Sequence, residues 1–169
     1  MHKFFAVLFV LSFFVISGCD DKKVETAPIK PTDIISKAEV EKVLDGADVI
    51  LEHGAVVDLG NNVYKASYLP NPLGSGDPVY VTVMYPSNNL SANEIKKIYT
   101  DSYSVRDNKK KIRGIGDGAF VAFPSLNIYE DGHLIKITAG SGDTQQQLDL
   151  LLELGQIAVK NLHTYLDNN

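Results

Sequence analysis

One hairpin decides the fold of this chain, and it lies in residues 126–138, which read LNIYEDGHLIKIT. Asp131-Gly132 is the strongest short signal for a two-residue turn between antiparallel strands. The residues on both sides are rich in isoleucine, leucine and tyrosine, which favour a pleated, half-buried surface. We therefore expect two strands, Leu126–Glu130 and His133–Thr138, joined by this turn.

Three more segments predict strands. In Val79–Met84, valine alternates with Tyr80, Thr82 and Met84, which is the period of a strand with one buried face. Asn62–Leu69 alternates in the same way, and Ala119–Phe123 precedes the hairpin. About five strands are therefore predicted, most of them joined by short turns.

Three helices are predicted by their start signals and their apolar spacing. Ser36-Lys37-Ala38-Glu39 fits a capping box and predicts a helix that stops at Gly46; Ser91-Ala92-Asn93-Glu94 repeats the pattern for a helix through Tyr103. A long helix should run from near Asp143 to about Leu166, with Gly155 allowing close approach to a sheet. Its second apolar stripe either widens the face on the sheet or forms a protein interface: Leu150, Leu154 and Ile157.

This order of elements favours an α+β fold. Strand runs joined by hairpins, with separate helices, are typical of an antiparallel sheet. We expect a curved sheet of about five strands, with the N-terminal, mid-chain and long C-terminal helices packed on one face. The domain should occupy residues 34–169 of the 169-residue chain.

The N-terminus has the composition of an export signal. Lys3 precedes an apolar stretch over Phe4–Ile16, which is shorter than the roughly 20 residues that span a membrane. The ending Ile16-Ser17-Gly18-Cys19 resembles a bacterial lipobox. This resemblance implies cleavage after residue 18 and lipidation of Cys19 with acyl chains such as palmitate. The alternative is a plain signal peptide that ends in a cysteine by chance. Cys19 is the one cysteine of the chain, so a lipidated chain would form no disulfide.

A short tether should follow the anchor. Residues 19–33 carry charges and two prolines and have almost no apolar periodicity, which is typical of a flexible linker. Asp20 and Asp21 resemble the signal that retains a lipoprotein in the inner membrane of a two-membrane host, facing the periplasm. The alternative is a solvated, charged tether.

A run of basic residues stands out in a chain of net charge −5: Arg106, Lys109, Lys110, Lys111 and Arg113. It is either a solvated loop edge or a contact surface for anionic lipid headgroups or an acidic partner. The chain has no strong basic excess, so nucleic-acid binding is not expected.

No convergent set of catalytic or metal-binding residues is recognisable. His53, His133 and His163 are widely separated and fit no metal-ligand spacing, so a surface or partly packed histidine is the expected role of each. Glu130 and Asp131 are adjacent, and neighbours along a strand point to opposite faces. The glycine-rich turns, such as Gly114–Gly118, predict tight turns and not phosphate loops. Only Gly140–Asp143 precedes a predicted helix, and it lacks the P-loop lysine. We expect no enzyme, no cofactor and no metal.

The segment Ile112–Phe120, IRGIGDGAF, is similar to a Gly-Leu-Gly-Asp-x-Ala-Tyr stretch of DUF3558-type small envelope lipoproteins. That resemblance implies a lipobox, a short linker, an opening helix and a final helix on a curved antiparallel sheet. It implies no general activity, and the chain lacks the paired mature-domain cysteines often found in that family.

These features together predict a lipid-anchored envelope protein that binds another envelope component. The alternative is a carrier or sensor of a small hydrophobic or lipid ligand in a cleft between sheet and helix, lined by Tyr64, Tyr80 and Phe120.

Overall fold

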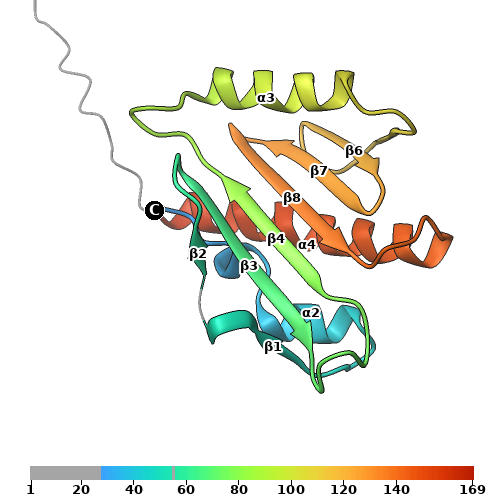
Figure 1. The fold of residues 1–169 in the computed structure, drawn as a ribbon. Helices are drawn as coiled ribbons and strands as arrows, with labels where there is room; N and C mark the ends of the chain where they lie inside the picture. The colour runs from blue at the N-terminus through green and yellow to red at the C-terminus, as the bar shows by residue number, and fades with distance from the viewer. Residues whose placement is uncertain (1–27, 55) are drawn as a thin grey trace, which may run out of the picture.

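The computed structural model describes residues 28–54 and 56–169 (Figure 1). They form one sheet of eight strands, together with four α-helices. The helices are α1 Pro31–Ile34, α2 Lys37–Val43, α3 Ala92–Ser104 and α4 Gln145–Asn168, and a 3-10 turn covers Glu52–Gly54. The strands are β1 Val49–Leu51, β2 Val57–Asp58, β3 Val63–Pro70, β4 Val79–Met84, β5 Lys110–Ile112, β6 Gly118–Ala122, β7 Ser125–Glu130 and β8 His133–Ala139.

The sheet is antiparallel, with the order β1-β3-β4-β8-β7-β6-β5 and with β2 beside β3. The predicted turn joins β7 to β8, and both of its residues have positive φ, 45° at Asp131 and 79° at Gly132. This confirms the predicted hairpin and the α+β class. The prediction of about five strands was too low, because β1, β2 and β5 are edge strands of two or three residues. Such strands are too short to show a period of two.

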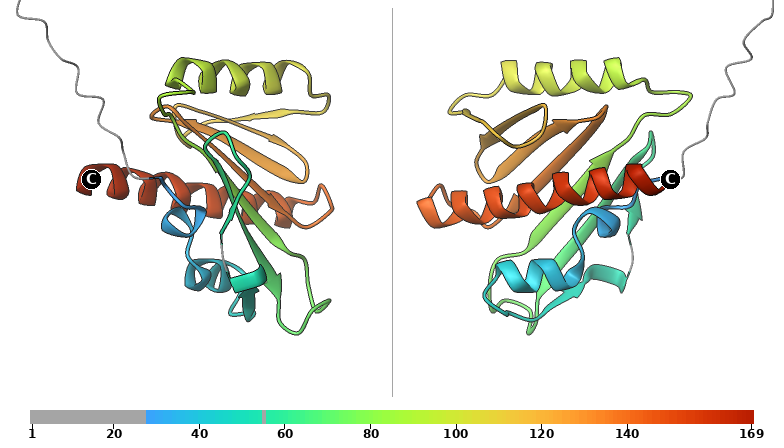
Figure 2. Two further views of the ribbon diagram at one scale, coloured as in Figure 1. Left: turned by 60° about the vertical axis from the view of Figure 1, so that its left-hand side comes forward. Right: turned by 180° about the vertical axis from the view of Figure 1, so that it is seen from behind.

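The main core lies between one face of the sheet and helices α1, α2 and α4. In register, Ala66 pairs with Val81, Val81 with Ile137, and Ile137 with Leu126, so their side chains share this face. All four are fully buried. Figure 2 shows α4 crossing the back of the sheet, with α1 and α2 beside it.

Helix α3 packs on the opposite face, contrary to the prediction that the helices share one face. Phe120 pairs with Asn127, whereas the next residue, Val121, pairs with Leu126 on the core face. Successive side chains of a strand alternate between faces, so Phe120 points to the second face. The rings of Tyr99 and Tyr103 lie 5.4 and 5.3 Å from the ring of Phe120. Phe120 is 1% exposed, so α3 closes a small second core above the sheet.

The prediction for Gly155 is confirmed. A Cβ atom at this position of α4 would lie 2.5 Å from Cδ2 of Leu126 and 3.3 Å from Cδ1 of Ile128. The missing side chain therefore lets the helix backbone approach β7.

The packed structure begins before the predicted start at residue 34. Ile29 is 2% exposed and belongs to the main core, and α1 begins at Pro31. The Nδ2 group of Asn161 in α4 donates a hydrogen bond to the carbonyl oxygen of Ile34 at 2.9 Å. The last residues of the predicted tether are thus part of the domain.

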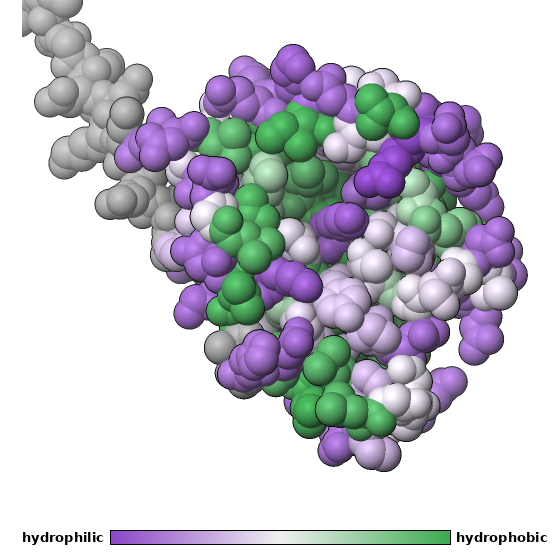
Figure 3. Space-filling view, in the orientation of Figure 1, coloured by the Kyte–Doolittle hydropathy of each residue, from purple (hydrophilic) through white to green (hydrophobic). Residues whose placement is uncertain are grey.

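The second face is only partly covered by α3. Seen from that side, Figure 3 shows hydrophilic residues lying between separate hydrophobic patches. The most exposed large apolar side chains, Val105 and Leu73, lie outside the strands and helices. Within the described residues, no helix has the length and apolar character needed to cross a membrane.

Candidate functional site

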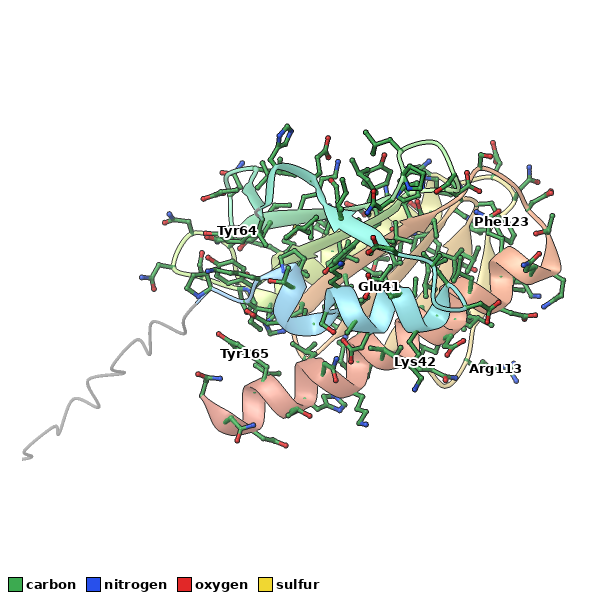
Figure 4. The ribbon with its side chains drawn as sticks, turned by 90° about the horizontal axis from the view of Figure 1, so that it is seen from below. Glu41, Lys42, Tyr64, Arg113, Phe123 and Tyr165 are labelled. Carbon is green, nitrogen blue, oxygen red and sulfur yellow. The ribbon has the colours of Figure 1, made fainter. Side chains whose placement is uncertain are left out.

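A groove of about 530 Å³ lies where the end of α2, the β3–β4 loop, the end of β8 and the first half of α4 meet. Figure 4 shows α2, on which Glu41 and Lys42 are labelled, beside α4. Two glycine-rich turns border the groove. Ser75, Gly76 and Asp77 come from the first turn, and Gly140 comes from the second.

Part of the lining of the groove is apolar. Val49 and Val79 are buried residues at the ends of β1 and β4. Leu44 follows α2, and Leu150 projects from α4, where the second apolar stripe was predicted. That stripe divides in the structure, because Leu154 is fully buried in the core whereas Leu150 stays half-buried at the groove.

The rim of the groove is acidic. Four exposed carboxylates line it: Asp45, Asp77, Asp149 and Glu153. No described lining residue is basic. Two of them come from α4, one follows α2 and one lies in the β3–β4 loop. An apolar surface edged by one sign of charge favours a ligand of the opposite sign.

A buried glutamine fixes one wall. Gln147, 9% exposed, donates from Nε2 to the carbonyl oxygen of Ala139 and accepts at Oε1 from the amide of Gly142 at 2.9 Å. Thr144 caps α4 by accepting from the Gln147 amide at 3.2 Å. The helix therefore begins at Gln145, two residues after Asp143, near which its start was predicted. These bonds hold the β8–α4 loop against the helix and preserve the shape of the groove.

A second polar cluster joins the β7–β8 turn to α4. Nε2 of His163 lies 2.5 Å from Oε1 of Glu130 and 3.4 Å from Oδ2 of Asp131. Nδ1 of His133 lies within hydrogen-bond distance, 2.8 Å, of the carbonyl oxygen of Asp131, and burial lowers the pKa of His133. Glu130, Asp131 and His163 have the donor types and the proximity to hold a metal ion.

The sequence pattern does not predict this cluster, because neighbours along a strand, as Glu130 and Asp131 would be, point to opposite faces. Asp131 instead occupies the turn with a φ of 45°, so both carboxylates reach His163. The Asp-Gly turn signal could have indicated this, because it removes Asp131 from the strand.

The predicted anchor residues Cys19, Asp20 and Asp21 lie outside the described residues. The predicted basic contact surface does not form one face. Successive strand residues point to opposite faces, so Lys110, opposite Val121, and Lys111, opposite Phe120, diverge.

The other basic residues are also dispersed. Lys109 is half-buried and lies 4.6 Å from the ring centre of Tyr103. Arg106 lines a separate cavity of about 200 Å³ with Lys136. Arg113 is exposed beyond the end of β5, and Figure 4 places it at the opposite end of the molecule from Tyr64.

The three residues of the predicted apolar cleft do not meet. Tyr64 pairs with Val83 on the core face and stacks on Tyr85 at 5.8 Å. Tyr80 lies on the second face beneath the ammonium of Lys65, and Phe120 is buried under α3. The groove at α2 and α4 is a different sheet-and-helix cleft from the predicted one. The sequence signals near it were Leu150 of the second apolar stripe and two glycine-rich turns, Gly74–Asp77 and Gly140–Asp143.

No family model, curated protein or solved structure matches this chain. The similarity to DUF3558-type lipoproteins stays a prediction, and the groove and the Glu130–Asp131–His163 cluster must be interpreted from their own chemistry.

Proposed function

We propose that this chain is a lipid-anchored bacterial envelope protein, attached through Cys19, whose domain is a non-catalytic binding module. Its groove takes a segment of another envelope protein that is partly apolar and positively charged. In a host with two membranes, Asp20 and Asp21 would keep the protein on the periplasmic face of the inner membrane.

The observation that carries this proposal is the combination of a partly apolar lining and an acidic rim in one groove. Leu44 and Leu150 offer surface to apolar side chains, while the four rim carboxylates attract lysine or arginine. Near a protein surface, an ion pair at contact distance gains about 4 kcal/mol before desolvation. The same rim repels anionic lipid headgroups, which favours a basic protein segment over the alternative of a lipid ligand.

The position of the groove agrees with a tethered binding module. Asn161, in the second half of α4, bonds to Ile34 near the start of the domain, whereas the groove lies along residues 144–153 in the first half. The described chain begins beside the C-terminal end of α4 (Figures 1 and 2). The groove is therefore at the end of the domain away from the side on which the chain enters.

Photo-crosslinking from the groove in intact cells would test this function. A photoreactive amino acid replaces Gln146, which is exposed and lines the groove. We expect a protein adduct whose crosslinked peptide carries a net positive charge. Glu153→Lys should reduce the adduct about tenfold, because it reverses one rim charge.

Asp167→Lys is the matched control, since it makes the same charge change on an exposed position of α4 outside the lining of the groove. It should leave the adduct unchanged. An acidic crosslinked peptide, or equal adduct from the Glu153→Lys protein, would contradict the proposal. A lipid adduct in place of a peptide would instead support the carrier function.

A further inference from the structure

Three potential metal ligands meet outside the groove. Glu130 Oε1, Asp131 Oδ2 and His163 Nε2 all lie within 4.8 Å of one another. Two of them come from the end of β7 and its turn, and the third comes from α4. Residues 33 positions apart are thus brought together by the packing of the helix on the sheet.

The buried member of this cluster is held in a fixed orientation. Glu130 is 7% exposed, and its second oxygen, Oε2, accepts the amide hydrogen of Asp117 at 2.5 Å. Gly116 makes this approach possible, because its φ is 59° and a Cβ there would lie 3.0 Å from Oε2 of Glu130. The Gly114–Gly118 turn therefore orients the Glu130 carboxylate through the hydrogen bond from Asp117. Carboxylates that bind metal ions are commonly held by such hydrogen bonds.

The other two members are open to solvent. The side chains of Asp131 and His163 are 54% and 48% exposed, so an ion can enter and retain a water ligand. Two carboxylates face one imidazole, which leaves an excess of negative charge when the histidine is neutral. A buried carboxylate is stabilised by pairing or by metal coordination.

We propose that Glu130, Asp131 and His163 bind a divalent transition metal ion, with Zn²⁺ the best match. Zn²⁺ accepts imidazole nitrogen and carboxylate oxygen at about 2.0–2.2 Å, so tetrahedral ligand atoms stand roughly 3.3 Å apart. The 3.4 Å between Nε2 of His163 and Oδ2 of Asp131 matches that separation. The 2.5 Å hydrogen bond between His163 and Glu130 would open by under about 1 Å as the metal replaces its proton. Ca²⁺ and Mg²⁺ prefer all-oxygen sites and fit a histidine-containing set poorly.

The test is a titration of the full chain, solubilised in detergent and stripped with a chelator, with ZnCl₂ alone. Calorimetry should show one saturable high-affinity ion per chain, and the thermal unfolding midpoint should rise with Zn²⁺ concentration. Co²⁺ should give the visible absorption of a low-symmetry site. His163→Ala and Asp131→Asn should each weaken binding about tenfold or more.

His53→Ala is the matched control. Nε2 of His53 lies 3.7 Å from Oε1 of Glu52, and among the described residues no second carboxylate joins this pair in a potential metal cluster. Loss of His53 should leave Zn²⁺ binding unchanged. Asp131 is exposed, so Asp131→Asn keeps the test valid if His163→Ala fails to fold, as far-UV circular dichroism would show. Zn²⁺ binding of equal affinity in Asp131→Asn, absence of saturable binding, or equal responses to Ca²⁺ and Zn²⁺ would each overturn the proposal.

Discussion

At the scale of single residues, Glu39 shows how a local signal also serves the tertiary structure. Its carboxylate accepts the amide and the hydroxyl of Ser36, each at 2.8 Å, which completes the capping box of α2. It also accepts from Nδ2 of Asn161 in α4 at 2.8 Å. Partial burial disfavours the charged carboxylate, but these hydrogen bonds outweigh it, and the pKa of Glu39 lies below its ordinary value of 4.5.

Glu39→Gln should therefore destabilise the domain in a pH-dependent way. A carboxyl group with a lowered pKa in the folded state contributes stability above its unfolded pKa, and this contribution is lost as the pH falls through the folded pKa. We expect a loss of about 1 kcal/mol at pH 7, and the difference from the unsubstituted protein should shrink below pH 4.5. Urea unfolding at pH 7 and at lower pH measures both effects.

Glu94→Gln provides the matched control. Glu94 makes the same capping box with Ser91 at the start of α3, and within residues 28–54 and 56–169 no other helix donates a hydrogen bond to its carboxylate. Its substitution should cost less than that of Glu39. Equal costs at the two positions would show that the bond from Asn161 contributes nothing.

At the scale of elements, the two faces of the sheet are covered by different helices. The core face carries α1, α2 and α4, and α3 covers part of the other face through its tyrosines. The amphipathic spacing of α3 showed that one side of the helix is buried. The spacing could not show which face of the sheet buries α3, because both faces of β6 and β7 carry apolar residues. Ala119 and Val121 lie on one face, and Phe120 and Tyr129 lie on the other.

Phe120→Ala should unfold α3 locally as well as lower global stability. Removal of a fully buried phenylalanine costs about 3–5 kcal/mol, and here it also removes the ring on which Tyr99 and Tyr103 pack. Hydrogen exchange followed by mass spectrometry should show lost protection in residues 92–104. Tyr80→Ala, on the same face beside Lys65, should leave the protection of α3 intact. Unaltered exchange of α3 in Phe120→Ala would argue against this second core.

At the scale of the whole molecule, the domain has two separate polar features on α4. The groove uses residues 144–153, and the proposed metal site uses His163 in the second half of the same helix. Residue 153, at the near edge of the groove, and residue 163 are about 15 Å apart along a straight helix. A partner segment in the groove and a metal ion at His163 therefore need not compete.

Cys19→Ala tests the anchor on which the proposed location rests. Two or three acyl chains give stable attachment, whereas a chain without them has no equivalent anchor. We expect the substituted protein to leave the membrane fraction and to appear in the soluble envelope fraction on immunoblots. Continued tight membrane association after a high-salt and carbonate wash would contradict lipidation at Cys19. Ser17→Thr, a change outside the lipidated position, should leave the protein in the membrane fraction.

The sequence by itself determined the local features of this protein. The Asp-Gly turn, the two serine capping boxes and the alternation in Val79–Met84 depend on neighbours along the chain, and the structure confirms each of them. The close approach at Gly155 was also predictable, because a glycine within an apolar stripe indicates contact with a neighbour.

Only the tertiary structure decided the face that α3 covers, the groove and the cluster around His163. Each joins residues that are distant in sequence, such as Glu130 and His163, and no local spacing records their approach. The rim carboxylates lie on α4, just after α2 and in the β3–β4 loop, and in sequence each resembles an ordinary solvated charge. Local hydrogen bonding and side-chain period specify elements, whereas the packing of apolar faces specifies which elements meet, and the candidate sites arise where they meet.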